Sequence, residues 1–289
     1  MSGEIDAPRV RLELTSRPEA ARLVRSMSSA AGEALGFDPE LLSDINTAVA
    51  EACNNVILHA YDDEAGPLLV ELGGPPDSVE VRIRDYGRGM GQAVPEHDRL
   101  KVGLALMSAL ADRAEFISPP DGGTEVRLTF AQPGAAPAAE PTSVVGASNG
   151  HRSWELDRGV DLPGDVVLTV SPVGLLGPIL GRLGRTFAPS AGFSLQRCYD
   201  VYLLTDVLAA HAERAAQAGA ISVSLGALNR RLEFAVSPLR AGTSGSLQAA
   251  GSPGATAEAP LASLTEEIGI TAIDGYETLR VSMRDPLRG

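Results

Sequence analysis

The feature that most constrains the fold is a stretch near the middle of the chain that cannot build a core. Residues 131–150, AQPGAAPAAEPTSVVGASNG, consist mostly of alanine, proline, glycine and serine, with almost no large apolar side chain. Such a composition is typical of a linker. The sequence therefore predicts two folded units, residues 1–130 and residues 151–289, on either side of this linker.

The first unit alternates between segments with the two-residue period of a strand and segments with the 3.6-residue period of a helix. Pro39 follows Asp38, as expected for the first residue of a helix after its N-cap, and Gly36 is expected to end the preceding helix. This order predicts an α/β two-layer sandwich, in which a mixed β-sheet carries helices on one face. The expected strands are 9–16, 67–74, 78–87, 113–119 and 123–130, and the expected helices are 18–36, 38–61 and 100–112.

The second unit repeats this plan. Its last strand, GYETLRVSM, keeps the alternation of GGTEVRLTF from the end of the first unit. The pattern predicts one fold present twice, which indicates a duplication. The matching segments are 165–172, 174–187, 194–216, 220–227, 230–238, 261–269 and 275–283, of which 174–187, 194–216 and 261–269 are expected helices.

Charge and composition exclude several classes of protein. The net charge is −13 and no basic stripe is visible, so direct nucleic-acid binding is not expected. No apolar run approaches the roughly 18 residues that span a bilayer, and the N-terminus lacks a secretory signal, so we expect a cytoplasmic protein without membrane binding. Cys53 and Cys198 lie too far apart for a metal-site spacing and form no disulfide framework.

The expected helix 38–61 contains polar residues in an otherwise apolar segment, VAEACNNVILHAY. Glu51 and Asn55 are four positions apart, so they lie on one helix face about a turn from each other. An amide oxygen suits Mg²⁺, and a carboxylate can act as a general base. The alternative interpretation is the ordinary polar face of an amphipathic helix.

Directly after a predicted strand comes the stretch RDYGRGM. Asp85 would present a fixed carboxylate that can accept hydrogen bonds from an exocyclic amino group such as that of adenine. Gly87 and Gly89 would let a ring lie against backbone without a Cβ in the way. A turn that merely ends a strand is the alternative interpretation.

Two further stretches add weaker signals. Gly103 is expected at the start of the helix 100–112, where free N–H groups attract phosphate. Lys101, the only lysine in the chain, lies two positions before it, and Thr124 opens the last strand of the unit. Taken separately, the two stretches are equally typical of a loop entering a helix and of a hairpin.

The order and spacing of these pieces over residues 9–130 resemble the GHKL (Bergerat-fold) ATPases. Within that group the chain most closely resembles the bacterial anti-sigma factor serine kinases, whose helix commonly reads EAxxNxxxHAY, here EACNNVILHAY. The resemblance implies that Glu51 is the catalytic base, Asn55 the magnesium ligand and Asp85 the adenine-binding carboxylate. It also implies nucleotide contacts from Gly87, Gly89, Gly103 and Thr124, and a protein-partner contact from Arg22.

Two departures from the family pattern stand out. Lys101 takes the place of the first glycine of a Gly-x-Gly pair, where it could bind phosphate or crowd the loop. By pattern, the second unit has Asp206 in place of the Glu, Ala210 in place of the Asn and Pro238 in place of the adenine carboxylate. Its lid segment, 241–260, is rich in Gly, Ala and Ser and is expected to be disordered. The second unit is therefore expected not to bind ATP.

The resemblance implies a serine protein kinase and anti-sigma factor that uses ATP and Mg²⁺ to phosphorylate an anti-sigma factor antagonist. Its partners would be that antagonist and a sigma factor. Because related kinases dimerise, the chain is expected to form either a homodimer or an intrachain pseudo-dimer. The alternative function is a non-catalytic binding module whose conformation ATP controls.

Overall fold

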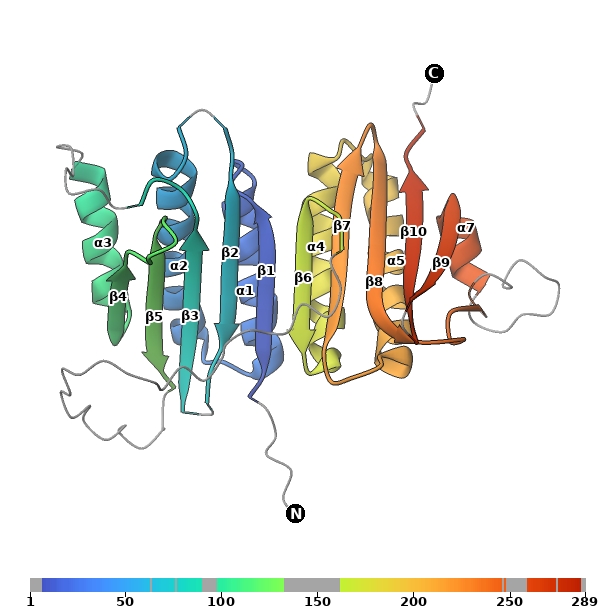
Figure 1. Cartoon of the computed structure of the whole chain (residues 1–289), viewed down its shortest axis with the longest axis horizontal. Helices are drawn as coiled ribbons and strands as arrows, with labels where there is room; N and C mark the ends of the chain where they lie inside the picture. The colour runs from blue at the N-terminus through green and yellow to red at the C-terminus, as the bar shows by residue number, and fades with distance from the viewer. Residues whose placement is uncertain are drawn as a thin grey trace, which may run out of the picture.

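The computed structural model of the protein describes residues 7–62, 64–75, 77–89, 98–132, 162–245, 247, 259–273 and 275–286. Its ten described strands form one sheet in the order β4-β5-β3-β2-β1-β6-β7-β8-β10-β9 (Figure 1). The first half contains β1 (Arg9–Thr15), α1 (Ala20–Leu35), α2 (Pro39–His59), β2 (Pro67–Gly73), β3 (Ser78–Asp85), α3 (Asp98–Leu110), β4 (Arg113–Ile117) and β5 (Glu125–Ala131). The second contains β6 (Val166–Ser171), the 3-10 helix η1 (Val173–Leu175), α4 (Leu176–Ser190), α5 (Leu195–Ala215), β7 (Ile221–Leu228), β8 (Arg231–Arg240), α7 (Ala259–Leu264), β9 (Glu267–Ile273) and β10 (Tyr276–Arg284).

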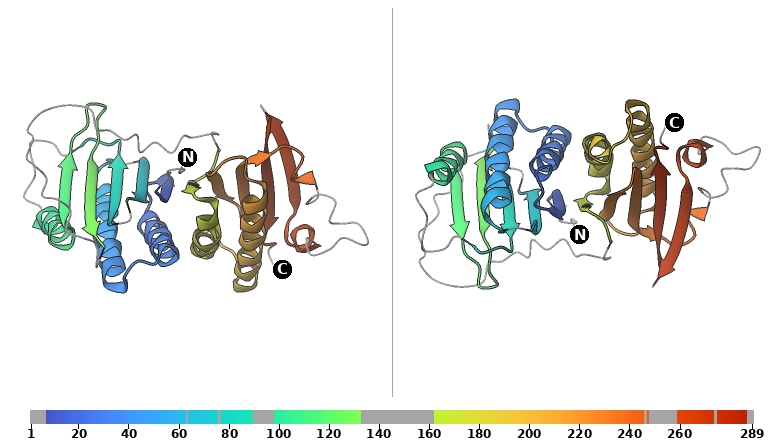
Figure 2. Two further views of the ribbon diagram at one scale, coloured as in Figure 1. Left: turned by 90° about the horizontal axis from the view of Figure 1, so that it is seen from below. Right: turned by 90° about the horizontal axis from the view of Figure 1, so that it is seen from above.

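The predicted two-layer sandwich is confirmed, with the helices on one side of the sheet (Figure 2). Neighbouring strands among the described residues all pair antiparallel, whereas a mixed sheet was expected. The reason lies in the connections. Two helices join β1 to β2. The first runs back along the sheet, and the second returns the chain to the end at which β1 stopped, so β2 runs antiparallel to β1. No helix in the described part of the chain is long and apolar enough to cross a membrane.

Helix α2, which carries the predicted chemistry, begins and packs as the sequence indicates. The Asp38 side chain accepts a hydrogen bond from the Glu40 backbone N–H at 2.8 Å, and Pro39 occupies the first helical position. The preceding helix ends at Gly36, whose φ of 73° lies in the left-handed region that favours glycine. The face of α2 toward the sheet is buried and apolar, so burial fixes the rotation of the helix and with it the direction of its polar residues.

The second half has the same element order and strand order as the first. Outward from the centre of the sheet, β1-β2-β3-β5-β4 on one side matches β6-β7-β8-β10-β9 on the other. One prediction was wrong here: the helix expected over 261–269 ends at Leu264, and Glu267–Ile273 form β9. Strand β9 pairs along its length with β10 at the edge of the sheet. This pairing forms a strand although apolar and polar residues alternate only weakly in the segment. The predicted linker from residue 133 onward, and most of the lid segment 241–260, lie outside the described residues.

The two halves join through strands and helices together. Strand β1 pairs antiparallel with β6 over six residue pairs, from Arg9 opposite Ser171 to Leu14 opposite Val166. On the helix side α1 lies against α4, where the Ser26 and Thr186 hydroxyls are 2.8 Å apart. Arg182 donates two hydrogen bonds to the Glu33 carboxylate, at 2.9 and 2.7 Å. One buried apolar cluster therefore runs across both halves.

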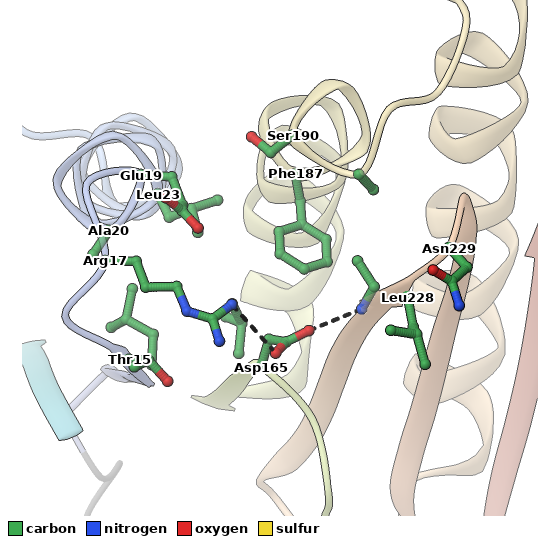
Figure 3. Close-up of a pocket in the computed structure, with 14 residues that line it drawn as sticks. Thr15, Arg17, Glu19, Ala20, Leu23, Asp165, Phe187, Ser190, Leu228 and Asn229 are labelled. Carbon is green, nitrogen blue, oxygen red and sulfur yellow. Dashed lines mark hydrogen bonds and ion pairs between the residues drawn. The ribbon is translucent and has the colours of Figure 1, made fainter. Parts of the chain in front are cut away.

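Beside this junction lies a small cavity of about 250 Å³, lined by both halves (Figure 3). Its apolar wall includes Leu23 and Phe187. At its floor the Arg17 guanidinium lies 3.9 Å from the Asp165 carboxylate, whose other oxygen accepts the Ala227 backbone N–H at 2.9 Å. The contact between halves is thus well packed along β1 and β6 and looser at this corner.

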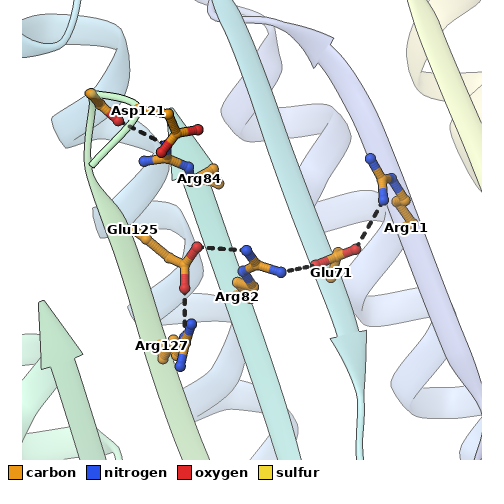
Figure 4. A network of polar contacts seen from close by, with 8 residues as sticks. Arg11, Glu71, Arg82, Arg84, Asp121, Glu125 and Arg127 are labelled. Carbon is orange, nitrogen blue, oxygen red and sulfur yellow. Dashed lines mark hydrogen bonds and ion pairs between the residues drawn. The ribbon is translucent and has the colours of Figure 1, made fainter. Parts of the chain in front are cut away.

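On the open face of the first half, charged residues alternate across the strands (Figure 4). Glu71 is buried between Arg11 and Arg82, and Arg82 also bonds Glu125 at 2.7 Å. Burial raises the pKa of Glu71 even though both arginines oppose that effect. At the end of β3, buried Arg84 donates to Asp121 and to the Gly122 carbonyl, both at 2.8 Å. This last contact fixes the turn that leads into β5 beneath the predicted site.

Candidate functional site

The fourth and fifth turns of α2 hold Glu51 and Asn55, both half-buried. Helix α3 packs against α2 at this level. A Cβ placed on Gly103 would lie 2.3 Å from the Glu51 Oε1 atom, well inside contact distance. Glycine at position 103 therefore gives α3 room beside the Glu51 carboxylate, and the structure brings these two predicted site residues together.

The position of Gly103 within α3 differs from the prediction. Helix α3 begins at Asp98, so Gly103 lies inside the helix and its N–H is not one of the free groups of the first turn. Lys101 is also helical, and its side chain lies outside the described residues. The helix therefore begins two residues before the predicted start at Leu100.

The end of β3 holds Asp85, which is only 2% exposed. Its Oδ1 atom accepts the Gly87 backbone N–H at 2.9 Å, and its own N–H donates to the Thr124 carbonyl at 2.9 Å. No described residue donates a hydrogen bond to Oδ2. A carboxylate oxygen on a buried side chain, without a donor among the described residues, is suited to accept from a ligand.

The loop after β3 is attached to the C-terminal end of α2. Arg88 donates its backbone N–H to the Ala60 carbonyl at 3.0 Å and its Nε–H to the His59 carbonyl at 2.8 Å. A Cβ on Gly87 would lie 2.1 Å from the Ala60 oxygen. The Tyr61 hydroxyl accepts the Tyr86 N–H at 2.9 Å, and burial raises the pKa of Tyr61. Tyr61 and Arg88 thus fix the distance between Asp85 and the helix that carries Glu51.

A further glycine completes the loop, and the sequence reasoning had not singled it out. Gly123 has a φ of 73°, and a Cβ there would lie 2.1 Å from the Asp85 carbonyl oxygen. Gly89, with a φ of 72°, lies beside it, since its Cβ would be 3.0 Å from the Gly123 oxygen. Half-buried Thr124 follows directly. The Gly-Gly-Thr sequence was the signal, but nothing in it indicated contact with Asp85.

The structure therefore brings most of the predicted residues together, from α2, the ends of β3 and β5, and α3. Arg22 is separate: it is exposed on α1, one turn before the Ser26 that contacts α4. What the cluster can hold follows from its chemistry. The Asp85 oxygen and the glycine-lined backbone suit a flat ring bearing an amino group. The Asn55 amide oxygen suits a hard cation that takes its other ligands from phosphate and water.

Residues 14–130 match the family model described as histidine kinase-like ATPase domain. The serine-protein kinase RsbW of Bacillus velezensis is 31% identical over 144 residues, which cover 45% of this chain and 88% of the relative. The anti-sigma F factor of Clostridium perfringens is 30% identical over 129 residues, covering 41% of this chain and 92% of the relative. The chain belongs to the histidine kinase-like ATPase family.

Within this family the chain resembles the anti-sigma kinases, as predicted. A solved structure of the RsbU and RsbW domains of Rv1364c from Mycobacterium tuberculosis matches 43% of this chain and 32% of that chain, at 25% identity. Its TM-score of 0.35 is too low to carry a structural argument. All the matched residues of the histidine kinase-like family model lie in the first half.

The second half can be compared with this ATPase half position by position. The buried residues of α2 recur in α5 156 positions later, for example Ile45 as Val201 and Ala52 as Leu208. This places Val207 at the position of Glu51 and His211 at that of Asn55, which corrects the predicted Asp206 and Ala210 by one residue. Burial decides the alignment, because the polar residues alone fit either register.

Strand register makes the rest of the comparison. Counting pairs outward from β1 and β6 places Pro238 at the position of Asp85, as predicted. The register of β10 shifts between Glu277 and Leu279, and Glu277, opposite Leu239, lies next to the position that matches Thr124. Glu277 accepts the backbone N–H groups of Gly242 and Ser244, the latter at 3.1 Å. The Ser244 hydroxyl lies 3.3 Å from His211 Nε2. The region of the second half that matches the candidate site is therefore filled by bonded protein groups.

Proposed function

We propose that the first half binds one ATP with Mg²⁺ and transfers its terminal phosphoryl group to a serine of an anti-sigma factor antagonist protein. The observation that carries this proposal is the buried side chain of Asp85, whose Oδ2 accepts from no described residue, joined through Gly87 and Arg88 to the helix of Glu51 and Asn55. The family and its serine kinase and anti-sigma members support the choice of reaction.

Each residue has a distinct role in this proposal. Asp85 accepts a hydrogen bond from the adenine amino group, and Gly87, Gly89 and Gly123 leave room for the ring and the sugar. Thr124 and Lys101 contribute nucleotide contacts, and Gly103 keeps α3 close to Glu51.

The phosphoryl transfer needs a base and a positioned cation. Glu51 accepts the proton of the serine hydroxyl as that oxygen attacks. Asn55 holds Mg²⁺, which when bound neutralises charge on the phosphates. When it is not phosphorylating the antagonist, the same half would bind a sigma factor, with Arg22 on the surface that contacts it. The name of the anti-sigma F factor relatives supports this role.

We infer that the second half occupies the place of a second subunit. Support comes from its identical strand order, from the pairing of β1 with β6 and of α1 with α4, and from the protein groups that fill its matching site. An intrachain pseudo-dimer of this kind has one nucleotide site per chain, in the first half.

Two measurements test the proposed function. Calorimetric titration with ATP should give one site per chain and much weaker binding when Mg²⁺ is chelated. Incubation with γ-labelled ATP and the candidate antagonist proteins of the same genome should leave labelled phosphoserine on one of them. Tight ATP binding with no labelled antagonist would instead favour the non-catalytic, ATP-controlled module.

A further inference from the structure

The cavity beside the junction, about 250 Å³ in volume, is built by both halves (Figure 3). The first half supplies the end of β1, the loop after it and the first turn of α1. The second half supplies the residue before β6, the last turn of α4 and the turn between β7 and β8. A cavity of about 150 Å³ in another protein already holds benzene, so this volume holds a molecule of roughly six to nine non-hydrogen atoms.

Part of the lining is apolar. Leu23 of α1 and Phe187 of α4 are buried, and the Phe187 ring lies above Asp165 in the view of Figure 3. Leu228 lines the side formed by β7, and it is 73% exposed. A molecule with an apolar part would remove this leucine from water, which favours binding.

Two carboxylates line the same cavity. Asp165 accepts the Ala227 backbone N–H through Oδ2 at 2.9 Å, while its Oδ1 atom lies 3.9 Å from the Arg17 guanidinium, beyond hydrogen-bond distance. The Arg17 side chain is 55% exposed, so solvent screens this ion pair and a ligand cation can replace it at little cost. Glu19 is half-buried, and its carboxylate bonds no described residue.

These carboxylates are specific to one corner of the junction. The offset of 156 positions that relates α2 to α5 also maps the pairing of β1 with β6 onto itself, so the junction has a second, related corner. There, buried Leu175 stands at the position of Glu19, and Arg9 stands at that of Asp165. The two halves can therefore be joined at such a corner without either carboxylate, which leaves the pair at this corner for another role.

We propose that this cavity binds a small molecule that joins a primary ammonium group to a short branched apolar chain. The ammonium group donates to the Asp165 Oδ1 atom and to the Glu19 carboxylate, and the apolar chain packs against Leu23, Phe187 and Leu228. The three charged side chains of the lining sum to −1, so a monovalent cation neutralises them.

The proposal is independent of phosphoryl transfer, because no residue that lines the cavity belongs to the candidate nucleotide site. The two sites lie at the same end of the sheet but on different strands. Thr15 at the cavity pairs with Pro67 of β2, and the next residue of β2, Leu68, pairs with Asp85 of β3. A ligand in the cavity contacts both halves and leaves the nucleotide residues free.

Two kinds of molecule carry this chemistry, namely free aliphatic amines and amino acids with a branched apolar side chain. An amino acid adds a carboxylate, which the Arg17 guanidinium can bind once the ammonium group has taken its place beside Asp165. A free amine makes no such use of Arg17. The arginine therefore distinguishes the two sources.

The test is calorimetric titration of the full chain with leucine and with two compounds that each lack one of its charged groups. Isoamylamine is leucine without the carboxylate, and isocaproate is leucine without the amino group. We expect isoamylamine to bind at one site per chain and isocaproate to bind at least tenfold more weakly. Equal binding of the two, or no binding of either ammonium compound, would overturn the proposal.

Two variants assign the binding to this cavity. Asp165→Asn can still accept the Ala227 N–H, but it turns an amide N–H₂ toward the ammonium group, so the Kd for isoamylamine should rise about tenfold. Ser190→Trp places a large ring at an exposed position of the lining and should abolish binding. Ala34→Trp is its matched control, since Ala34 is exposed at the related position of α1, outside the cavity, and the Kd should stay unchanged.

The source of the ligand follows from leucine. If leucine binds more tightly than isoamylamine and Arg17→Gln removes that advantage, the cavity takes an amino acid. If leucine binds much more weakly, the cavity takes a free amine, and both results support the site. Normal binding of isoamylamine by both Asp165→Asn and Ser190→Trp would place the ammonium compound elsewhere and refute the assignment.

Discussion

The two halves of this protein share a strand order, but the polar groups at their matching sites are bonded differently. In the first half, Asp85 is buried, and one of its carboxylate oxygens has no donor among the described residues. In the second half, proline stands at that position, and Glu277 reaches into the matching region. One site keeps an acceptor for something outside the chain, whereas the other satisfies its polar groups internally.

The difference shows how a binding site can be lost without losing the fold. Buried polar groups need partners, and a ligand or the protein itself can supply them. Burial raises the pKa of Glu277, but the bonds that its carboxylate accepts from Gly242 and Ser244 outweigh burial and lower the pKa below its ordinary value. Glu277 therefore remains ionised, and its carboxylate accepts the backbone N–H groups that a bound anion could otherwise have accepted.

The largest expected effect comes from Glu51, which is valine in the second half. Glu51→Gln keeps the size of the side chain and removes the base, so phosphoryl transfer to the antagonist should fall about a thousandfold. ATP binding should persist, because the adenine and Mg²⁺ contacts come from other residues. Single-turnover labelling measures the loss, and calorimetry on the same sample measures the binding. Undiminished labelling would remove Glu51 from its assigned role.

The next effect belongs to the filled site. Glu277→Ala leaves the Gly242 and Ser244 N–H groups without their acceptor, so the free energy of unfolding should fall by about 3 kcal/mol. Urea denaturation at pH 7 measures this change. The Kd for ATP should not move, because the site in the first half makes no contact with Glu277.

The pH dependence of this variant gives an independent check. A carboxyl with a lowered pKa in the folded state stabilises the protein above its unfolded pKa, and that contribution is lost as the pH falls through the folded pKa. The difference between Glu277→Ala and the unmodified protein should therefore shrink below about pH 4.5. A difference that stays constant into acid would show that the ionised carboxylate is not the source.

Asp85→Asn should have a smaller effect, on ligand affinity and not on stability. The Asn oxygen can still accept the Gly87 N–H, so the loop should stay folded. The amide N–H₂ would face the adenine amino group, and losing a charged acceptor costs about 2 kcal/mol, or roughly a thirtyfold rise in the Kd for ATP. Titration with ATP measures it. An unchanged Kd would mean that the ring binds elsewhere.

Much of this comparison could be predicted from the sequence because the informative features are local. Asp38 and Pro39 begin α2, Gly36 ends α1, and the four-residue spacing of Glu51 and Asn55 sets a shared helix face. The position of Asp85 at a strand end follows from alternation alone. These features depend on neighbours in the chain, and the structure has them as expected.

The features that escaped prediction depend on contacts between distant segments. The apolar period of α3 did not reveal that the helix begins at Asp98, and β9 is held mainly by its pairing with β10. Gly123 contacts Asp85 only because β5 returns beside β3. The one-residue alignment error at His211 arose because polar residues were matched, whereas burial by the sheet decides the register of α5.

The smallest expected effect concerns the junction between the halves. Arg182→Ala removes the two bonds to Glu33, but both side chains are partly exposed, at 32% and 56%. Solvent screens such a pair, so the free energy of unfolding should fall by less than about 1 kcal/mol. Arg185→Ala is the matched control, since Arg185 lies on the same helix and contacts Tyr202 of its own half instead.

The shape of the unfolding curve matters more here than its midpoint. The shared apolar cluster and the pairing of β1 with β6 should keep both halves unfolding in one transition, in the unmodified protein and in Arg182→Ala alike. Two separate transitions in the Arg182→Ala variant alone would show that the surface ion pair, and not the continuous sheet, couples the halves. In that case the second half would be held to the first mainly by a surface ion pair, and the coupling between the halves would weaken as the salt concentration rises.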